Sequence, residues 1–200
     1  TDSLEAVLAD SDAIIDFTVP ETTVANARLA VESGCGVVIG TTGYSTRDRD
    51  QLRDIAGRGR LVLAPNMSIG VNLLFHLCDH VARVLGEDYD IEVAEMHHNR
   101  KKDAPSGTAV RLGEILCHAR GLDPEQAIAH GRQGAAGPRG PREIGIHALR
   151  GGDVVGEHTV IFAADGERVE LSHKASSRET FARGAVRAAK FLASRGNGLY

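Results

Sequence analysis

The sequence predicts an α/β protein with two lobes, and three observations support this fold class. Short apolar runs rich in β-branched residues occupy positions 13–17, 37–41 and 61–64, as is typical of parallel strands covered on both faces. Helical patterns separate these runs, so strand and helix alternate along the first third of the chain. After Ser68 the pattern changes to one long helix followed mostly by strands, which indicates a separate α+β lobe. A chain of 200 residues has room for both lobes.

The first lobe is predicted to be a partial Rossmann-type parallel sheet. Its first helix opens at Pro20 and stops at Gly34, and its second covers about residues 45–56. The G-x-G-x-x-G fingerprint of dinucleotide binding is absent after the first strand, because the first glycine of the sequence is Gly34. Gly34-Cys35-Gly36 precedes a strand instead of following one, which indicates a helix stop and a turn.

The three predicted parallel strands end in turns made mostly of small or polar residues, which leave backbone groups accessible. These turns are residues 17–20, 40–43 and 64–68. Ligands of open α/β sheets bind outside the carboxyl ends of the strands, so the three turns are candidates to line one crevice. Plain tight turns are the alternative interpretation.

The second lobe is predicted to combine helices with a mixed sheet of roughly four strands. Helices are expected at about 70–85, 106–120 and 178–194, and strands at 89–96, 144–150, 154–163 and 168–175. Turn sequences at 151–153 and 165–166 favour an antiparallel meander for the last three strands. Residues 89–96 alternate apolar and acidic side chains, which predicts one wet or interfacial face. The Gly/Pro/Arg-rich segment 131–142 is expected to be a mobile loop, with closure over a substrate as a hypothesis.

Composition excludes several classes of function. The net charge is −4 and the basic residues are scattered apart from 100–102, so no nucleic-acid surface is expected. No apolar run approaches the roughly 20 residues that span a bilayer. The three cysteines, Cys35, Cys78 and Cys117, form no C-x-x-C pattern and are expected to be buried, reduced thiols of a cytoplasmic protein.

No metal site is predicted. His76 and His80 are four residues apart on a predicted helix, which is a spacing that zinc sites use. The glutamate of an H-E-x-x-H motif is missing, because Leu77 stands in its place. These histidines are therefore expected on a solvated or partner-contacting face.

The segment HHNRKKDAPSGTA, residues 97–109, is the strongest candidate for a functional site. Ser106 is placed to cap the following helix, whose first N–H groups, those of Gly107, Thr108 and Ala109, form a natural anion site.

Groups able to transfer protons stand beside that helix start. His97, His98 and Lys101 can exchange or donate protons, and Asp103 would orient them as an acceptor. The residues alone leave three possibilities: catalysis on an anionic substrate, an anion site without chemistry, or an exposed polar loop.

The same segment resembles the signature of the 4-hydroxy-tetrahydrodipicolinate reductase family. Further stretches are similar to that family in the same order, namely 15–18, 38–43, 66–72, 152–159 and 172–178. The resemblance covers essentially the whole chain. It implies a reductase of diaminopimelate and lysine biosynthesis that passes a hydride from NADH or NADPH to a cyclic, unsaturated dicarboxylate.

The resemblance also implies roles for individual residues. His97 would be the proton donor and acceptor, and Lys101 a proton donor. His98 would contact the substrate, and Gly107 with Thr108 would bind one of its carboxylates. The nicotinamide end of the cofactor would contact Gly40, Thr41, Thr42, Ala64, Pro65, Asn66 and Met67.

At the level of domains, the resemblance implies a nucleotide-binding domain from residues 1–67 and 178–200 and a substrate-binding and oligomerisation domain from 68–177. It further implies a homotetramer built through the second lobe's sheet.

The family's glycine-rich loop would precede Thr1, and the family tends to continue beyond Tyr200, so the sequence is expected to be a fragment. Two alternatives stay open: a module that keeps fold and oligomer contacts without binding cofactor, and a related two-lobe dehydrogenase of the aspartate or homoserine type. The motif at 97–109 argues against the dehydrogenase.

Overall fold

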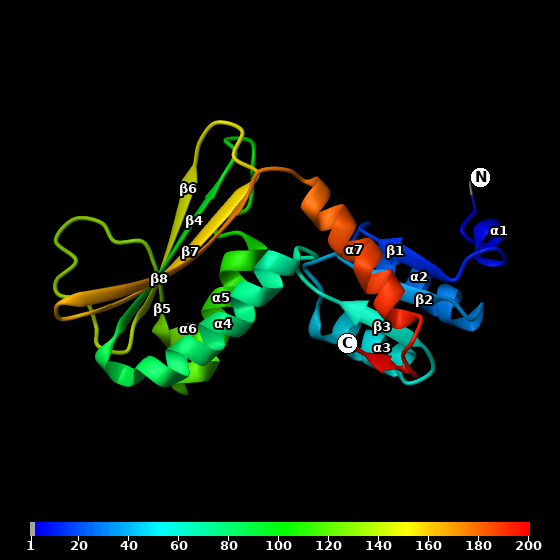
Figure 1. The fold of residues 1–200 in the computed structure, drawn as a ribbon, viewed down its shortest axis with the longest axis horizontal. Helices are drawn as coiled ribbons and strands as arrows, with labels where there is room; N and C mark the ends of the chain where they lie inside the picture. Colours follow the sequence, from blue (N-terminus) through cyan, green and yellow to red (C-terminus); the bar gives the residue numbers. More distant parts are fainter. Residues whose placement is uncertain (1–2) are drawn as a thin grey trace. The chain divides into compact units, whose positions relative to one another are not determined.

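The fold comprises two compact units, each with its own core (Figure 1). The computed structural model describes residues 3–200. The first unit is Thr1–Ser68 together with Glu179–Tyr200, and the second is Ile69–Arg178. The first unit is therefore assembled from two chain segments, whereas the second is continuous.

The first unit contains the predicted parallel sheet. Its elements are α1 (Glu5–Leu8), β1 (Ala13–Asp16), α2 (Pro20–Glu32), β2 (Gly36–Ile39), α3 (Thr46–Ala56), β3 (Arg60–Leu63), α7 (Glu179–Leu192) and β9 (Gly198–Leu199). The strand order is β1-β2-β3-β9, and each neighbouring pair is parallel within the described residues. The short β9 was not predicted, since two residues carry no periodic pattern.

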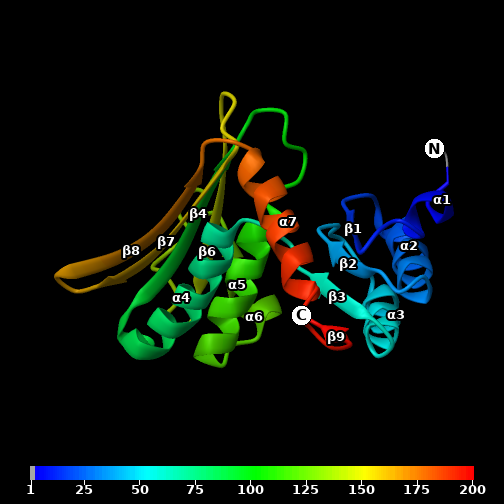
Figure 2. The same ribbon diagram turned by 45° about the vertical axis from the view of Figure 1, so that its right-hand side comes forward.

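Helices cover both faces of this sheet, as the continuous apolar strands predict. Val37 and Ile39 point toward the core shared with α2 and α3, while Val38 packs with Leu192 of α7 on the other face. Figure 2 shows α7 on the opposite side of the sheet from α2 and α3. The carboxyl ends of β1, β2 and β3 consequently lie along one edge.

The second unit contains a mixed sheet and the helices that cover it. Its elements are α4 (Ile69–Leu85), the 3-10 helix η1 (Gly86–Asp88), β4 (Asp90–His97), α5 (Gly107–Arg120), α6 (Pro124–Ala127), β5 (Ile128–His130), β6 (Ile144–Arg150), β7 (Gly156–Ala164) and β8 (Glu167–Ala175). Within Ile69–Arg178 the order of the five strands is β5-β6-β4-β7-β8, so the sheet has one strand more than predicted. The additional strand, β5, is only three residues long and follows α6 directly.

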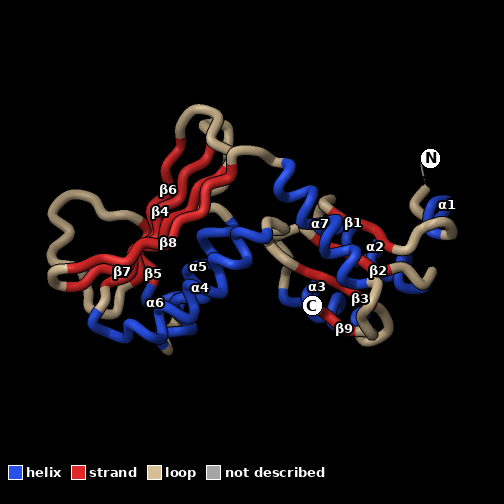
Figure 3. Tube along the Cα trace, viewed as in Figure 1, coloured by secondary structure: helices blue, strands red, loops and turns tan. Residues whose placement is uncertain are grey.

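The predicted antiparallel meander is wrong in its first step. β6 pairs in parallel with β4, and β7 pairs with β4 in antiparallel, so β4 lies between β6 and β7 (Figure 3). Only β7 and β8 form the expected hairpin. A parallel pair needs a long crossover, and the chain through α5 supplies it between β4 and β6.

The connection from β6 to β7 passes over the carboxyl end of β4. The N–H of Gly151 donates to the carbonyl of His97 at 2.9 Å, and the N–H of His98 donates to the carbonyl of Val154 at 2.7 Å. The turn at 151–153 therefore holds the start of the candidate motif instead of closing a hairpin.

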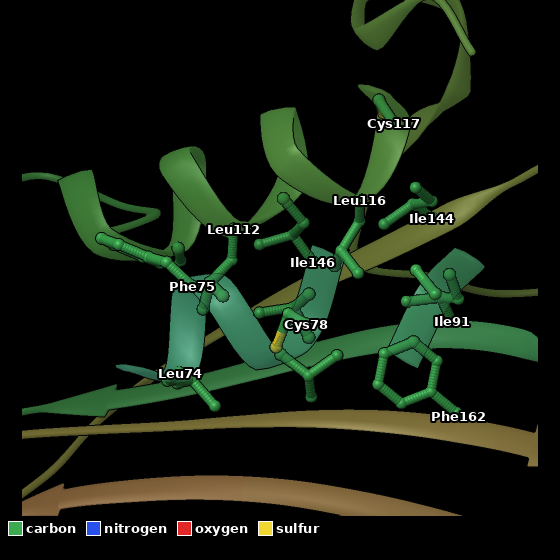
Figure 4. Packing of buried hydrophobic residues seen from close by; sticks show 14 of the residues in the cluster. Leu74, Phe75, Cys78, Ile91, Leu112, Leu116, Cys117, Ile144, Ile146 and Phe162 are labelled. Carbon is green, nitrogen blue, oxygen red and sulfur yellow. The ribbon is translucent and has the colours of Figure 1, made fainter. Parts of the chain in front are cut away.

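The core of the second unit lies between its sheet and the helices α4 and α5 (Figure 4). Leu74 of α4 and Leu112 of α5 meet Ile91 of β4 and Phe162 of β7 in this layer. Because side chains alternate along a strand, Ile91 and Val93 fix which face of β4 points to the helices.

The cysteines fulfil the expectation of buried, unpaired thiols. Cys35, Cys78 and Cys117 are all buried and free. Burial raises the pKa of Cys78 to about 12 and that of Cys117 to about 11, so both thiols stay neutral.

Across residues 3–200 the structure has no group of three His, Cys, Asp or Glu side chains arranged for a metal ion. None of the described helices combines the length and apolar character needed to cross a bilayer.

Candidate active site

His97 is the last residue of β4, and its ring is attached to a buried carboxylate. The Nδ1 atom of His97 lies 2.6 Å from Oε2 of Glu95, a side chain with no solvent exposure. Arg150 from β6 reaches the same carboxylate, with Nη1 and Nη2 each 2.9 Å from one oxygen. The pairing of β4 with β6 sets Arg150 directly beside His97 and so brings the three side chains together.

Glu95 is an ionised group in spite of its burial. Burial by itself raises its pKa, but hydrogen bonds from Arg150, from His97 and from the Ser106 N–H lower the pKa below its usual value. A buried carboxylate with this set of donors has its acceptor sites largely filled. The group is therefore an anion fixed at the end of β4.

His158 of β7 connects this cluster to the helix start. Its Nε2 lies 2.9 Å from the hydroxyl of Ser106, and its ring meets the ring of His97 edge-on at 5.2 Å between centroids. Burial, with a smaller contribution from the nearby His97, lowers the pKa of His158 to about 4. His158 is consequently neutral at pH 7 and acts as a hydrogen-bonding group.

The start of α5 has the capped geometry that the sequence predicts, with one correction. Ser106 is the N-cap, and its hydroxyl accepts from the N–H of Ala109 at 3.2 Å. The cap thus occupies the N–H of Ala109, so the prediction that this N–H forms part of the anion site is wrong. Gly107 and Thr108 occupy the first two helical positions, where N–H groups point out of the helix start.

The loop between β4 and α5 places the candidate lysine. Nζ of Lys101 lies 2.8 Å from each carboxylate oxygen of Asp103, so Asp103 orients the lysine. Arg150 donates to the backbone carbonyl of Asp103 at 2.7 Å. This arginine therefore ties the loop to the buried Glu95.

His98 occupies the neighbouring position but faces different groups. Its Nε2 is 3.5 Å from Nη2 of Arg178, at the limit of a hydrogen bond. Burial and then the cations Arg100 and Arg178 lower the pKa of His98, which keeps the ring neutral near pH 7. The surroundings of His98 are thus cationic, as a site for an anion requires.

In the first unit, a buried carboxylate organises the edge where the three strands end. Asp16, the last residue of β1, accepts from the backbone N–H of Thr18 at 2.8 Å, from Asn26 at 3.0 Å and from the hydroxyl of Thr41 at 3.3 Å. Burial raises the pKa of Asp16, but these hydrogen bonds outweigh it and lower the pKa overall. The candidate residue Thr41 is thereby joined to β1 and α2.

The backbone at Gly40 lies close to the side chain of Phe17. A Cβ at Gly40 would stand 2.2 Å from the ring of Phe17, so a larger residue there would require the exposed Phe17 side chain to move. Thr42, which follows Thr41, is exposed.

The stretch after β3 continues the same edge. The Ala64 N–H donates to Ile39 at 3.2 Å, and the Asn66 side chain accepts from the Ser68 N–H at 2.8 Å. Pro65 is exposed and Met67 is buried.

Three residues around His97 were not predicted as site residues from the sequence, namely Glu95, Arg150 and His158. Glu95 left a signal, because it falls in the same alternating phase as the buried Ile91 and Val93 and not in that of Glu92. Arg150 left none, and His158 was marked only by lying in the family-like stretch 152–159. The strand register sets both residues beside His97 and Glu95.

The loop at 131–142 is attached away from His97. Arg132 and Arg139 both bind Glu92, which lies near the start of β4 and on the face opposite to Glu95. The hypothesis that this loop closes over a substrate at His97 therefore gains no support from the structure.

Comparison with known proteins decides the family. A family model described as "Dihydrodipicolinate reductase, C-terminus" matches residues 70–200, and one described as "Dihydrodipicolinate reductase, N-terminus" matches residues 1–67. The chain belongs to the dihydrodipicolinate reductase family.

Relatives of the dihydrodipicolinate reductase family resemble the chain along its whole length. The 4-hydroxy-tetrahydrodipicolinate reductase of Anaeromyxobacter sp. (strain Fw109-5) is 53% identical over 199 residues, covering 100% of this chain and 74% of the relative. The enzyme of the same name from Chromobacterium violaceum is 53% identical over 195 residues, covering 98% of this chain and 73% of the relative.

A solved structure of a dihydrodipicolinate reductase has the same fold. The dipicolinate-bound enzyme from Paenisporosarcina sp. TG-14 aligns with a TM-score of 0.79 and 26% identity, over 100% of this chain and 76% of that one. The UDP-N-acetylglucosamine 3-dehydrogenase of Acidithiobacillus ferrooxidans aligns with a TM-score of 0.57 at 15% identity, which shows a shared fold only.

Proposed function

We propose that this member of the dihydrodipicolinate reductase family reduces 4-hydroxy-tetrahydrodipicolinate to tetrahydrodipicolinate with NADH or NADPH, in diaminopimelate and lysine biosynthesis. One observation carries the proposal: the buried Glu95 holds His97 by Nδ1, next to the N-terminus of α5. An acid–base group thus stands beside a site for a carboxylate. The names of the relatives support the same reaction.

The residues of the second unit bind the substrate and supply protons. Gly107 and Thr108 receive one carboxylate at the start of α5, where the N–H groups and the helix dipole favour an anion. His98 contacts the bound substrate. His97 and Lys101 give protons to atoms that gain negative charge, a kind of help typically worth roughly 10²–10⁴-fold in rate. The dipicolinate bound to the Paenisporosarcina enzyme is a ring with two carboxylates, which supports this substrate class.

The strand ends of the first unit fit the nicotinamide end of a cofactor. Gly40, Thr41 and Thr42 follow β2 at its carboxyl end, which is where open α/β sheets bind their ligands. Residues 64–67, from Ala64 to Met67, continue the same edge after β3. When bound, the reduced nicotinamide supplies the hydride, and the chain's own groups position it and the substrate.

We further propose the roles of the two domains. Residues 1–67 with 178–200 form the nucleotide-binding domain, and 68–177 form the domain for substrate binding and oligomerisation. A homotetramer assembles through the face of the mixed sheet that points away from α4 and α5. Met96, Leu149 and Ile161 lie on that face by their strand phase, and Leu149 is 49% exposed. Light scattering that gives the mass of a monomer at micromolar concentration would contradict this assembly.

The decisive experiment follows cofactor and substrate separately. The protein is titrated with NADH and with NADPH while nicotinamide fluorescence is recorded, with and without dipicolinate. Reduction of freshly generated 4-hydroxy-tetrahydrodipicolinate is followed by the loss of nicotinamide absorbance. Binding of either cofactor, strengthened by dipicolinate, and turnover of the substrate are expected. Absence of cofactor binding would instead favour a non-catalytic module, and turnover of an aspartate-type substrate would favour a related dehydrogenase.

A further inference from the structure

We propose that Glu95 is the positioning residue of His97: it holds the imidazole with a proton on Nδ1, so that Nε2 is the nitrogen that exchanges a proton with the substrate. The inference rests on the proposed function for the meaning of the exchange. The position of the proton on the ring follows from the geometry by itself.

The hydrogen bonds around Glu95 determine which partner donates. An ionised carboxylate only accepts hydrogen bonds. Oε1 accepts from the N–H of Ser106 and from Nη2 of Arg150, each at 2.9 Å. Oε2 accepts from Nη1 of Arg150 and lies 2.6 Å from Nδ1 of His97. Nδ1 must therefore carry a hydrogen, in the neutral ring as well as in the charged one.

Charge supports the same assignment. The lowered pKa of Glu95 means that this carboxylate does not take up a proton to become the donor. Arg150 pairs with it in a bidentate arrangement, the strongest geometry for an arginine and a carboxylate. Glu95 is thus a fixed acceptor, and the hydrogen of the short contact belongs to His97.

The other ring nitrogen faces a position where a side chain is missing. A Cβ at Gly156 of β7 would lie 3.0 Å from Nε2 of His97, closer than nearly all real Cβ contacts. The absence of a side chain at Gly156 leaves room for the His97 ring. The His97 side chain is 12% exposed. In the proposed step the charged ring breaks its Nε2–H bond, and the proton forms a new bond to the substrate atom. The neutral Nδ1–H ring remains, and solvent later returns the proton.

Glu95 also fixes His97 relative to the other parts of the site. Its contact to the N–H of Ser106 ties it to the start of α5, where the carboxylate is proposed to bind. Through Arg150, which donates to the carbonyl of Asp103, it is tied to the loop of Lys101. Loss of the carboxylate is therefore expected to disturb the orientation of His97 more than the fold, since Arg150 keeps a backbone partner.

Glu92 offers a matched control on the same strand. Its Oε2 lies 2.6 Å from Nε2 of His147, and it binds Arg132 and Arg139. Its chemistry is thus nearly the same as that of Glu95, but its side chain lies on the opposite face of β4. A general effect of losing a carboxylate that pairs with arginine and histidine would appear in both variants, although Glu92 is 21% exposed and Glu95 is fully buried. Loss of the positioning of His97 would appear only in Glu95→Gln.

The test combines histidine NMR with kinetics on the whole protein. Ring nitrogens are labelled with ¹⁵N, and His97 is assigned from the signal that a His97→Gln variant lacks. In the wild type at high pH, the neutral ring is expected to carry its hydrogen on Nδ1. In Glu95→Gln the Nε2–H form is expected to appear, and kcat to fall by about 10²-fold or more with the KM for cofactor nearly unchanged. Glu92→Gln is expected to alter neither signal nor kcat.

The outcomes separate this inference from the proposed function. A wild-type ring with its hydrogen on Nε2 overturns the inference, whatever the variants do. So does a Glu95→Gln protein that keeps both the Nδ1–H signal and full turnover. If Glu95→Gln does not fold, Glu95→Asp keeps the charge at a shorter reach, and an Nδ1–H signal that weakens there together with kcat supports the inference, whereas an unchanged signal with reduced kcat contradicts it. A wild type with the Nδ1–H ring but without reductase activity would contradict the proposed function alone.

Discussion

At the scale of single residues, the two neighbouring histidines of the candidate site have different surroundings. His97 contacts an ionised carboxylate, whereas His158 is buried, and burial brings its pKa to about 4. Lys101 is held by Asp103 near the surface of the loop. These surroundings are consistent with the proposed roles, which are proton transfer for His97 and Lys101 and hydrogen bonding for His158.

Removal of the proton-transferring groups should affect turnover and spare cofactor affinity. His97→Ala and Lys101→Ala are each expected to lower kcat by roughly 10²–10⁴-fold, because a positioned acid contributes about that factor. The Kd for NADH, from fluorescence titration, should change little, since the residues proposed to contact the cofactor lie in the other unit. Unchanged turnover in both variants would contradict the assignment.

The lowered pKa of His158 predicts a pH dependence of stability. The unfolded chain binds a proton on this ring below pH 6.5, whereas the folded chain resists it until about pH 4. Above pH 6.5 the ring is neutral in both states and does not reduce stability. As the pH falls toward 4, the free energy of unfolding decreases by up to about 3 kcal/mol because only the unfolded chain binds the proton.

Urea unfolding between pH 7.5 and 4.5, monitored by circular dichroism, would measure this loss. The wild type should lose more stability over this range than His158→Gln, which keeps a hydrogen-bonding group but does not titrate. Glu95 also faces His158, but its lowered pKa puts its own loss at more acidic pH. Parallel pH profiles of the two proteins would contradict the prediction.

At the scale of elements, the start of α5 combines stability with function. Ser106 caps the helix through Ala109, bonds to His158 and receives Glu95 at its backbone N–H. The comparable helix start at α3 has a capping box between Ser45 and Asp48 in the other unit. The two serines share one structural task, and only Ser106 touches the candidate site.

Paired substitutions should separate these tasks. Ser45→Ala and Ser106→Ala are each expected to cost about 1 kcal/mol for the lost cap. Ser106→Ala should cost about 1–3 kcal/mol more, because Nε2 of His158 is left buried without its partner. Only Ser106→Ala should raise the KM for the dicarboxylate substrate. Chemical denaturation and steady-state kinetics of both variants provide the measurement, and equal KM values would contradict the role of this helix start.

At the scale of the whole molecule, the two units differ in how the chain builds them. Ile69–Arg178 is continuous, whereas the first unit needs Glu179–Tyr200 to complete it. α7 covers one face of the parallel sheet, and its Gly184 lies against the backbone of Met67, where a Cβ would stand 1.7 Å from the carbonyl oxygen. The first unit therefore depends on close packing by the end of the chain.

Deletion of residues 179–200 should unfold one unit and spare the other. Without α7, buried side chains such as Val38 and Met67 become exposed to water, so the first unit is expected to lose its cooperative structure. The core of the second unit draws only on residues 71–171 and should persist. Hydrogen exchange read by mass spectrometry, with the full chain as reference, would test this. Protection lost equally in both units would contradict their independence.

Much of the fold follows from local patterns in the sequence. The runs at 13–17, 37–41 and 61–64 predict the three parallel strands because continuous apolar strands must be covered on both faces. Ser106 predicts a helix start because a serine hydroxyl satisfies a first-turn N–H. Such features depend on neighbours in the chain. The short β5 and β9 depend on distant partners and left no local signal.

The residues of the candidate site also separate into those that a local pattern indicates and those that distant partners bring into place. By itself the sequence determined the two-lobe α/β plan and the segment with His97, His98, Lys101, Gly107 and Thr108, since its motif is contiguous. Only the tertiary structure decided that β4 lies between β6 and β7. That order places Arg150 and His158, more than fifty residues along the chain, beside Glu95. The physical reason is that strand order and register arise from the packing of the whole sheet, which no local pattern encodes.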